Sequence, residues 1–354
     1  MSAKCKILFL SLLCFATLLS SANEKSIDQS VKKALADKFY NPENKFWVGV
    51  DLIYAKAREK SLVLTNHKCD LFTTDDFTKS APLHPHFDWD FGYRIGMGYL
   101  FPPHMHHALD ISMEWMHYHT RAEQHELANE TANIQGMFPI WSLSDDILRG
   151  DYVTRADLNW GLTINMLDLA LNYSLHYKKR IEMKSFVGLR SGWIKQRMDI
   201  DYKGGIFLLD LLASGVSLVG TDTIAMKNNF WGLGPIVGVC PRYILCHGIR
   251  LYVDTAISGL CGYYSLHQKE TYLEKTRFYS SRHPVQFRWI GDLGAGAYWK
   301  TFLYKTTYPV VVKLGWEYHI FFNQMKLQGD AFGLVSDNRN LELQGVTLST
   351  SLDF

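Results

Sequence analysis

The sequence has no hydrophobic run long enough to cross a membrane as a helix. None of the stretches after residue 22 approaches the roughly 20 apolar residues that such a helix needs. Mean hydropathy is −0.10. These values exclude a helical membrane bundle. They do not exclude a membrane β-barrel, because its lipid-facing residues alternate with polar ones and the average stays near zero.

The chain also has no large excess of positive or negative charge, and it has few cysteines. The 354 residues include 37 Lys and Arg against 35 Asp and Glu, and six Cys. A near-neutral chain lacks the basic face that nucleic acid requires, so nucleic acid is excluded as a partner. So few cysteines cannot build a disulfide scaffold of this length. Aromatic residues, in contrast, reach 14%, which excludes a disordered chain.

The N-terminus has the pattern of a secretory signal. Lys4 and Lys6 precede an apolar stretch from residue 7 to 19, and Ser20-Ser21-Ala22 supplies small residues for cleavage. We expect residues 1–22 to be removed, which leaves 35 basic and 35 acidic residues and the cysteines Cys69, Cys240, Cys246 and Cys261. Residues 23–45 are expected to form a periplasmic segment, helical over 26–40.

The remaining chain alternates apolar and polar residues, which indicates β-strands. In residues 86–100 one face is Phe87, Trp89, Phe91, Tyr93, Ile95, Met97 and Tyr99, and the other is Asp88, Asp90, Gly92, Arg94, Gly96 and Gly98. Similar segments occur at 46–57, from 108, at 154–177, 184–202, 229–240, 248–264, 285–299 and 308–322. A soluble β-sandwich also alternates, but its strands are usually shorter and its core does not accept unpaired charges.

Short and long connections alternate along the chain. The short ones are 101–107, 178–180, 241–247 and 301–307, and the long ones are 58–85, 121–153, 203–227, 265–283 and 323–340. This order is typical of an all-β transmembrane antiparallel up-and-down barrel with short periplasmic turns and long external loops. Ten strands result if 154–177 is one strand with a bulge near Met166, where the alternation changes phase. Twelve result if that point is a turn.

The C-terminus resembles a signal read by the barrel-insertion machinery of the outer membrane. Phe354 ends the chain, and Leu352, Thr350, Leu348 and Val346 share its face. Together with the signal sequence and the alternating strands, this end predicts location in the bacterial outer membrane.

Several motifs resemble the major-outer-membrane-protein-like porins of chlamydia-related bacteria (Chlamydiales). They are Trp141, the runs 155–160, 167–169 and 186–190, Trp193 with Gln196, and the run 229–235. The resemblance covers residues 46–354 and implies an outer-membrane barrel with a porin or structural role. The chlamydial proteins are rich in cysteine, so four mature cysteines depart from the family pattern.

The polar face of a barrel is its interior, so the charges on it set selectivity. The residues predicted to line the lumen are Asp88, Asp90, Arg94, Asp110, Glu114, Arg155, Asp157, Lys184, Arg190, Arg250, Asp254, Arg288, Asp292, Lys313 and Glu317. Their signs balance, and ten to twelve strands enclose little space. We therefore expect a narrow porin for ions or small hydrophilic solutes. The alternative is a structural or adhesive envelope barrel with a blocked lumen.

Other candidate sites have weaker patterns. His84, His86, His104, His106, His107, His117 and His119 have close spacing, but no completing ligands point to a metal, and no metal or other cofactor is expected. The spacing of the residues singles out no catalytic nucleophile, so we do not expect an enzyme. Cys240 and Cys246 flank a predicted turn, where a disulfide or two free thiols are equally compatible.

The apolar segment 206–219 is expected to cap or constrict the lumen. The expected partners are outer-membrane lipid, the insertion machinery and small solutes or ions, with a homo-oligomer left open.

Overall fold

The fold is taken from a computed structural model. It describes residues 46–59, 61–62, 64–70, 82–102, 107–128, 135–139, 141, 153–178, 180–204, 221–246, 249–302, 309–326 and 340–354. The signal sequence 1–22, the segment 23–45 and the apolar segment 206–219 lie outside these residues. In the described part of the chain, no helix is long and apolar enough to cross a membrane.

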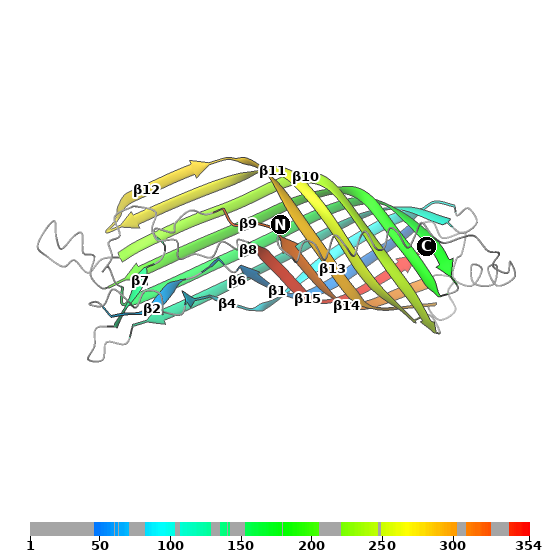
Figure 1. Cartoon of the computed structure of the whole chain (residues 1–354), viewed down its shortest axis with the longest axis horizontal. Helices are drawn as coiled ribbons and strands as arrows, with labels where there is room; N and C mark the ends of the chain where they lie inside the picture. The colour runs from blue at the N-terminus through cyan, green and yellow to red at the C-terminus, as the bar shows by residue number, and fades with distance from the viewer. Residues whose placement is uncertain are drawn as a thin grey trace, which may run out of the picture. The chain divides into compact units, whose positions relative to one another are not determined.

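Ten antiparallel strands form a closed ring (Figure 1). In chain order they are β1 (Phe46–Glu59), β5 (Trp89–Leu100), β6 (His107–Leu127), β8 (Arg155–Lys178), β9 (Ile181–Lys203), β10 (Thr221–Cys246), β11 (Ile249–Tyr272), β13 (Val285–Phe302), β14 (Pro309–Phe321) and β15 (Leu341–Asp353). Neighbours in the chain pair with each other, and β1 pairs with β15 to close the ring. The predicted ten-stranded up-and-down barrel is confirmed.

Five short strands lie at the end of the barrel that carries the long connections. β2 (Thr65–Asp70), β3 (Pro82–Leu83) and β7 (Gln135–Pro139) form a small separate sheet. β4 (His86–Phe87) extends the edge of β6, and β12 (Lys275–Arg282) folds back on β11. We call this the loop end and the opposite end, where the chain terminates, the turn end (Figure 1).

The last strand closes the barrel at the turn end. The amide of Phe354 donates to the carbonyl of Phe46 at 2.8 Å, and the amide of Phe46 donates back at 2.9 Å. The outward face of this strand carries Val346, Leu348, Thr350, Leu352 and Phe354, all exposed. The apolar row expected of an insertion signal is therefore on the outer surface.

The strands are longer than a membrane requires. β8 has 24 residues and β10 has 26, whereas about 9–11 residues cross the hydrocarbon core. The extra length lies at the loop end, where β6, β10 and β11 extend into the predicted loops 121–153, 203–227 and 265–283. The predicted turn 241–247 is also shorter, because β10 continues to Cys246.

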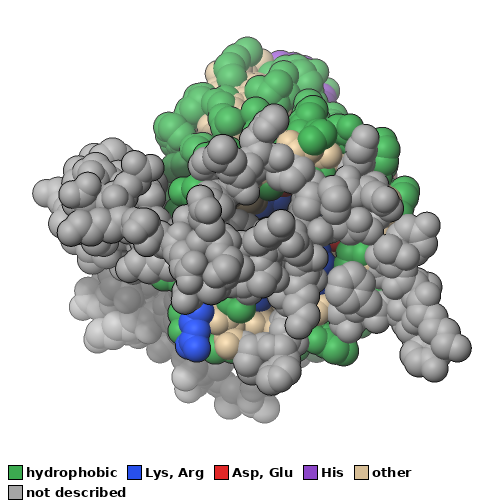
Figure 2. Space-filling view, turned by 90° about the vertical axis from the view of Figure 1, so that its right-hand side faces the viewer, with side chains coloured by type: hydrophobic (Ala, Val, Ile, Leu, Met, Phe, Trp, Pro, Cys, Tyr) green, Lys and Arg blue, Asp and Glu red, His purple; other side chains and the backbone are tan. Residues whose placement is uncertain are grey.

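Polarity inverts between the two halves of the barrel. On β8, Leu169, Leu171 and Tyr173 are exposed on the outside at the turn end. Farther along the same strand, Leu158 and Ile164 point inward and are fully buried. Seen from the turn end, hydrophobic side chains cover the outer wall and basic side chains show inside it (Figure 2). The turn-end half is therefore built for lipid, and the loop-end half is built like a soluble barrel.

The inversion corrects the predicted bulge near Met166. Pairing of β8 with β9 runs without a shift from Arg155 opposite Lys203 to His176 opposite Glu182. The alternation changes phase because the surroundings of the strand change from lipid to water, so the apolar residues move from the outer face to the inner one.

Candidate functional site

Twelve of the fifteen charges predicted to line the lumen lie on the inner face of the barrel. They alternate with exposed outward residues on their strands, and they are Asp90, Arg94, Asp110, Glu114, Lys184, Arg190, Arg250, Asp254, Arg288, Asp292, Lys313 and Glu317. These twelve side chains therefore alternate with the outward-facing residues of their strands.

Arg155 and Asp157 were predicted to lie on the inner face of β8, and this prediction is wrong. They share the outward parity of Leu169 on β8, and Arg155 Nε donates to Asp157 Oδ2 at 2.8 Å on the outer surface. The error follows from the polarity inversion. In the loop-end half the apolar residues of β8 face the core, so the polar residues that alternate with them face outward.

Asp88 is also not a lumen residue. Its side chain is 68% exposed and lies 3.1 Å from His86 Nδ1. Phe87 packs inward on Trp160, whereas Trp89 stacks on the outward Tyr54. The pairing with β6 shifts by one residue between β4 and β5, and this irregularity turns Asp88 out of the lumen.

A chain of ion pairs crosses the interior at mid-barrel. Arg94 on β5 donates to Asp51 on β1 at 2.9 Å and to Glu317 on β14 at 2.7 Å. His319 Nδ1 lies 2.7 Å from Asp292, and Nε2 lies 3.4 Å from Glu317. The network thereby joins four strands through groups that are each at most 17% exposed.

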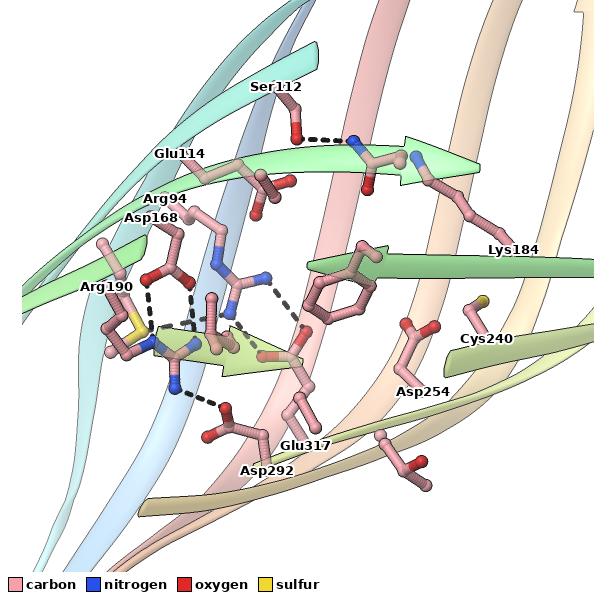
Figure 3. Close-up of a pocket in the computed structure, with 18 of the residues that line it drawn as sticks. Arg94, Ser112, Glu114, Asp168, Lys184, Arg190, Cys240, Asp254, Asp292 and Glu317 are labelled. Carbon is pink, nitrogen blue, oxygen red and sulfur yellow. Dashed lines mark hydrogen bonds and ion pairs between the residues drawn. The ribbon is translucent and has the colours of Figure 1, made fainter. Parts of the chain in front are cut away.

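Arg190 extends the network to the opposite wall. Its guanidinium donates to both oxygens of Asp168 at 2.7 Å and to Asp292 at 2.5 Å. Figure 3 shows Arg94 and Arg190 reaching their carboxylates from different strands. Paired arginines of this kind fix the geometry of the carboxylates that they bridge.

A second cluster lies nearer the turn end. Glu182 accepts from Arg242 at 3.2 Å and from Arg250 at 2.7 Å, and Lys184 lies 3.4 Å from Asp110. The two clusters border a cavity of about 220 Å³. Its charged lining residues are Arg94, Glu114, Asp168, Lys184, Arg190, Arg242, Asp254, Asp292, Lys313 and Glu317, five basic and five acidic, with His319 beside them. The formal charges of the lining therefore balance, and apolar side chains such as Met166 and Phe186 lie among them.

An apolar layer fills the lumen directly beyond the ion pairs. It is formed by inward side chains from many strands, all at most 5% exposed: Ile53, Met116, Met166, Ile194, Phe230, Leu260, Ile290 and Phe321. Farther toward the loop end, Leu62, Leu64, Met137, Trp141 and Val153 join the same buried cluster. The Tyr202 hydroxyl donates to the carbonyl of Leu64 at 2.9 Å and fixes this inserted chain.

The carboxyl groups of Glu59 and Asp222 are buried in the loop-end half, beyond the lipid-facing surface. Burial raises the pKa of Glu59 to about 8, an effect that hydrogen bonds from Ser61 partly offset. Burial, with repulsion from Glu270, raises the pKa of Asp222 to about 7. Both groups are protonated over part of the physiological pH range.

Several inward ionisable residues were not predicted from the sequence, among them Asp51, Asp168, Glu182, Arg242, His319 and the ion pair of Lys300 with Asp353. Asp51 lies in a segment whose two faces differ little in polarity. Asp168 lies beside Met166, where the apolar–polar alternation changes phase. Glu182 and Arg242 fell in or beside predicted turns. Counting parity outward from each strand centre would have found these residues.

Of the two alternatives left open for Cys240 and Cys246, the structure excludes the disulfide. Cys240 is a buried free cysteine, and both residues belong to one continuous strand. Six residues of strand place their Cα atoms about 20 Å apart, far beyond the roughly 7 Å that a disulfide spans.

The candidate histidines that the structure describes make separate contacts. His84 Nδ1 contacts the carbonyl of Leu62, and His117 and His119 contact Asn165 and Thr163 on the outer surface. His104 and His106 lie outside the described residues, as does the side chain of His107. Within the described chain, no group of three or more potential ligands is placed to hold a metal ion.

Comparison with solved structures returns other outer-membrane barrels at low similarity. The outer membrane protease OmpT of Escherichia coli is 12% identical with a TM-score of 0.36, over 89% of this chain and 98% of that one. The toluene transporter TodX of Pseudomonas putida is 8% identical with a TM-score of 0.29, over 94% and 95%. An anion-selective porin of Comamonas acidovorans is 7% identical with a TM-score of 0.23, over 87% and 98%. Similarity at this level supports no inference of function.

Sequence comparison is more specific. No curated protein matches the chain, but a family model described as the Legionella pneumophila major outer membrane protein precursor matches residues 40–354. The match supports the major-outer-membrane-protein part of the resemblance and gives no support to its Chlamydiales part. With its closed barrel and lipid-facing surface, the chain belongs to the Legionella major outer membrane protein family and is a protein of the bacterial outer membrane.

Proposed function

We propose that the protein is a closed outer-membrane barrel with a structural and surface-displaying role. The observation that carries this proposal is the apolar layer around Ile53, Leu260 and Phe321, which fills the lumen directly beyond the ion pairs. Hydrophobic constrictions exclude water and therefore ions, because a hydrated ion would have to shed its shell there.

The ion pairs themselves also favour a closed lumen. Arg94 and Arg190 each hold two carboxylates, so neither offers a free charge to a passing solute. An anion that bound Arg94 or Arg190 would have to displace a carboxylate from that arginine. Breaking such a pair strands a buried charge, at a cost of about 3–5 kcal/mol.

The loop-end half supports a display role. Its outer surface is polar while its interior is a packed core. A folded platform of this kind carries the short strands β2, β3, β7 and β12 at the loop end. Surface loops on a rigid scaffold commonly carry recognition, so we infer that the partners of this barrel bind at the loop end.

A second candidate is a narrow porin, favoured by the cavity of about 220 Å³ with its balanced lining. Such a porin would pass ions or small hydrophilic solutes with weak charge selectivity. Passage then requires the apolar layer to move. Absence of catalysis and of cofactors remains a prediction under both candidates.

Liposome swelling tests the proposal. Liposomes carrying the refolded protein are diluted into arabinose, and solute entry is followed by light scattering. We expect the rate of protein-free liposomes, while liposomes with a wide porin swell rapidly. Arabinose entry that rises in proportion to the amount of this protein would contradict the closed barrel and favour the narrow porin.

A further inference from the structure

The outer face of the loop-end half begins with basic residues. On β6, β9 and β10 the lipid-facing surface ends at Trp115, Trp193 and Trp231. The charged outward residues closest to these rings are Arg121, Lys195, Arg197 and Lys227, which we call the basic collar. Acidic residues, such as Glu123 and Asp199, follow only farther along the strands.

Strand register brings the collar together. Arg121 on β6 lies opposite Gly161 on β8, Gly161 lies opposite Arg197 on β9, and Arg197 lies opposite Lys227 on β10. Like charges directly opposite on neighbouring strands are destabilising. The repulsion between Arg197 and Lys227 would be relieved by an external anion.

Neighbouring acids neutralise little of this charge. Arg197 Nε donates to Asp199 at 2.6 Å, in a pair whose arginine is 66% exposed. Arg121, Lys195 and Lys227 form no ion pair with any described residue. An exposed pair of this kind contributes little, so Arg197 can turn toward a stronger anion.

Gly161 leaves a notch between the two arginines. No atom lies within 4 Å of the position that a Cβ would occupy there. Thr163, which hydrogen-bonds His119 at 3.0 Å, and Asn159 flank the notch on the same outward face. A small tetrahedral anion can approach the strand there, with guanidinium groups on both sides and side-chain donors along the strand.

We propose that the basic collar binds the phosphate groups of an anionic lipid in the adjoining leaflet, with one phosphate seated over Gly161 between Arg121 and Arg197. The collar follows directly after aromatic rings of the kind that mark a membrane interface, which is the depth of lipid headgroups. Clustered Lys and Arg near a membrane surface attract anionic lipid, and arginine matches the geometry of phosphate.

The test titrates the detergent-solubilised full-length protein with lipid A, a bisphosphorylated lipid, and with its dephosphorylated form, and counts bound lipid by native mass spectrometry. The variants are Arg121→Gln with Arg197→Gln, which removes charge, and Gly161→Leu, which fills the notch and keeps every charge. Arg58→Gln with Lys275→Gln removes two exposed cations from β1 and β12, outside the collar, and serves as the matched control.

We expect the double arginine variant to bind lipid A about thirtyfold more weakly, the effect of two membrane-facing charges. Gly161→Leu should weaken binding several-fold, and the control should bind like the unaltered protein. Gel mobility of the unheated barrel confirms that each variant is folded. Equal affinity of the unaltered protein for the two lipid forms, or equal losses in the collar and control variants, would overturn the proposal.

Discussion

Arg94 Nη2 and Glu317 Oε2 lie 2.7 Å apart although 223 residues separate them in the chain. β1 and β15 stand between their strands in the ring, so the pair crosses the interior instead of linking neighbours. The same guanidinium binds Asp51 on β1. One arginine therefore ties together three separate stretches of the barrel wall.

Replacing Arg94 by Ala should destabilise the barrel by about 3–5 kcal/mol, because the buried carboxylates of Asp51 and Glu317 both lose the guanidinium that pairs with them. The measurement is the free energy of unfolding from a urea titration in lipid vesicles. Arg155→Ala is the matched control, since Arg155 is 49% exposed, and should cost less than about 1 kcal/mol. If both variants lost the same free energy of unfolding, the pairing of Arg94 with Glu317 would stabilise the barrel no more than an exposed ion pair does.

The polarity inversion can be tested on a single strand. Leu171→Arg places a charge on the lipid-facing outer surface of β8, where it should cost about 2–4 kcal/mol. Asn159→Arg has the same parity beyond that surface and should change stability by less than about 0.5 kcal/mol. A large loss of stability in Asn159→Arg would indicate that lipid contacts the whole length of β8, and would contradict the polarity inversion.

Stability should fall as pH rises from about 5 to 8. The pKa of Glu59 is raised to about 8 and that of Asp222 to about 7 in the folded barrel, so the folded state holds protons that the unfolded chain has already lost. Each carboxyl contributes a slope of about 1.4 kcal/mol per pH unit within its window. Urea titrations across this range measure it. Glu59→Gln with Asp222→Asn should flatten the profile, and an unchanged slope would contradict the assignment.

Cysteine labelling tests the strand assignment of β10. Cys240 is buried in the lumen, whereas Cys261 is exposed on the outward face of β11. A membrane-permeant maleimide should label Cys261 in the folded protein and Cys240 only after unfolding. Peptide mapping without reductant should show no bridge between Cys240 and Cys246, and recovery of that bridge would contradict the continuous strand.

The fold could be predicted from the sequence where one rule governed a whole segment. Residues 89–100 face lipid on one side and a polar lumen on the other, so alternation gave the strand and the position of Arg94. The outward row ending at Phe354 followed in the same way.

Prediction failed where the surroundings changed along a strand. Leu158 and Leu171 are both apolar and belong to one strand, yet one faces the core and the other faces outward. Alternation alone does not show which apolar face meets lipid. The pairing of Arg94 with Glu317 was equally inaccessible, since it depends on the curvature of the closed ring.

Single-channel recording tests the closed lumen most directly. The refolded protein is inserted into a planar bilayer in 1 M KCl, with protein-free detergent and a wide porin as controls. The apolar layer around Ile53 and Phe321 predicts insertion without stepwise current, since a dry constriction blocks hydrated ions. Reproducible current steps whose number grows with the amount of folded protein would contradict a closed lumen and establish the narrow porin.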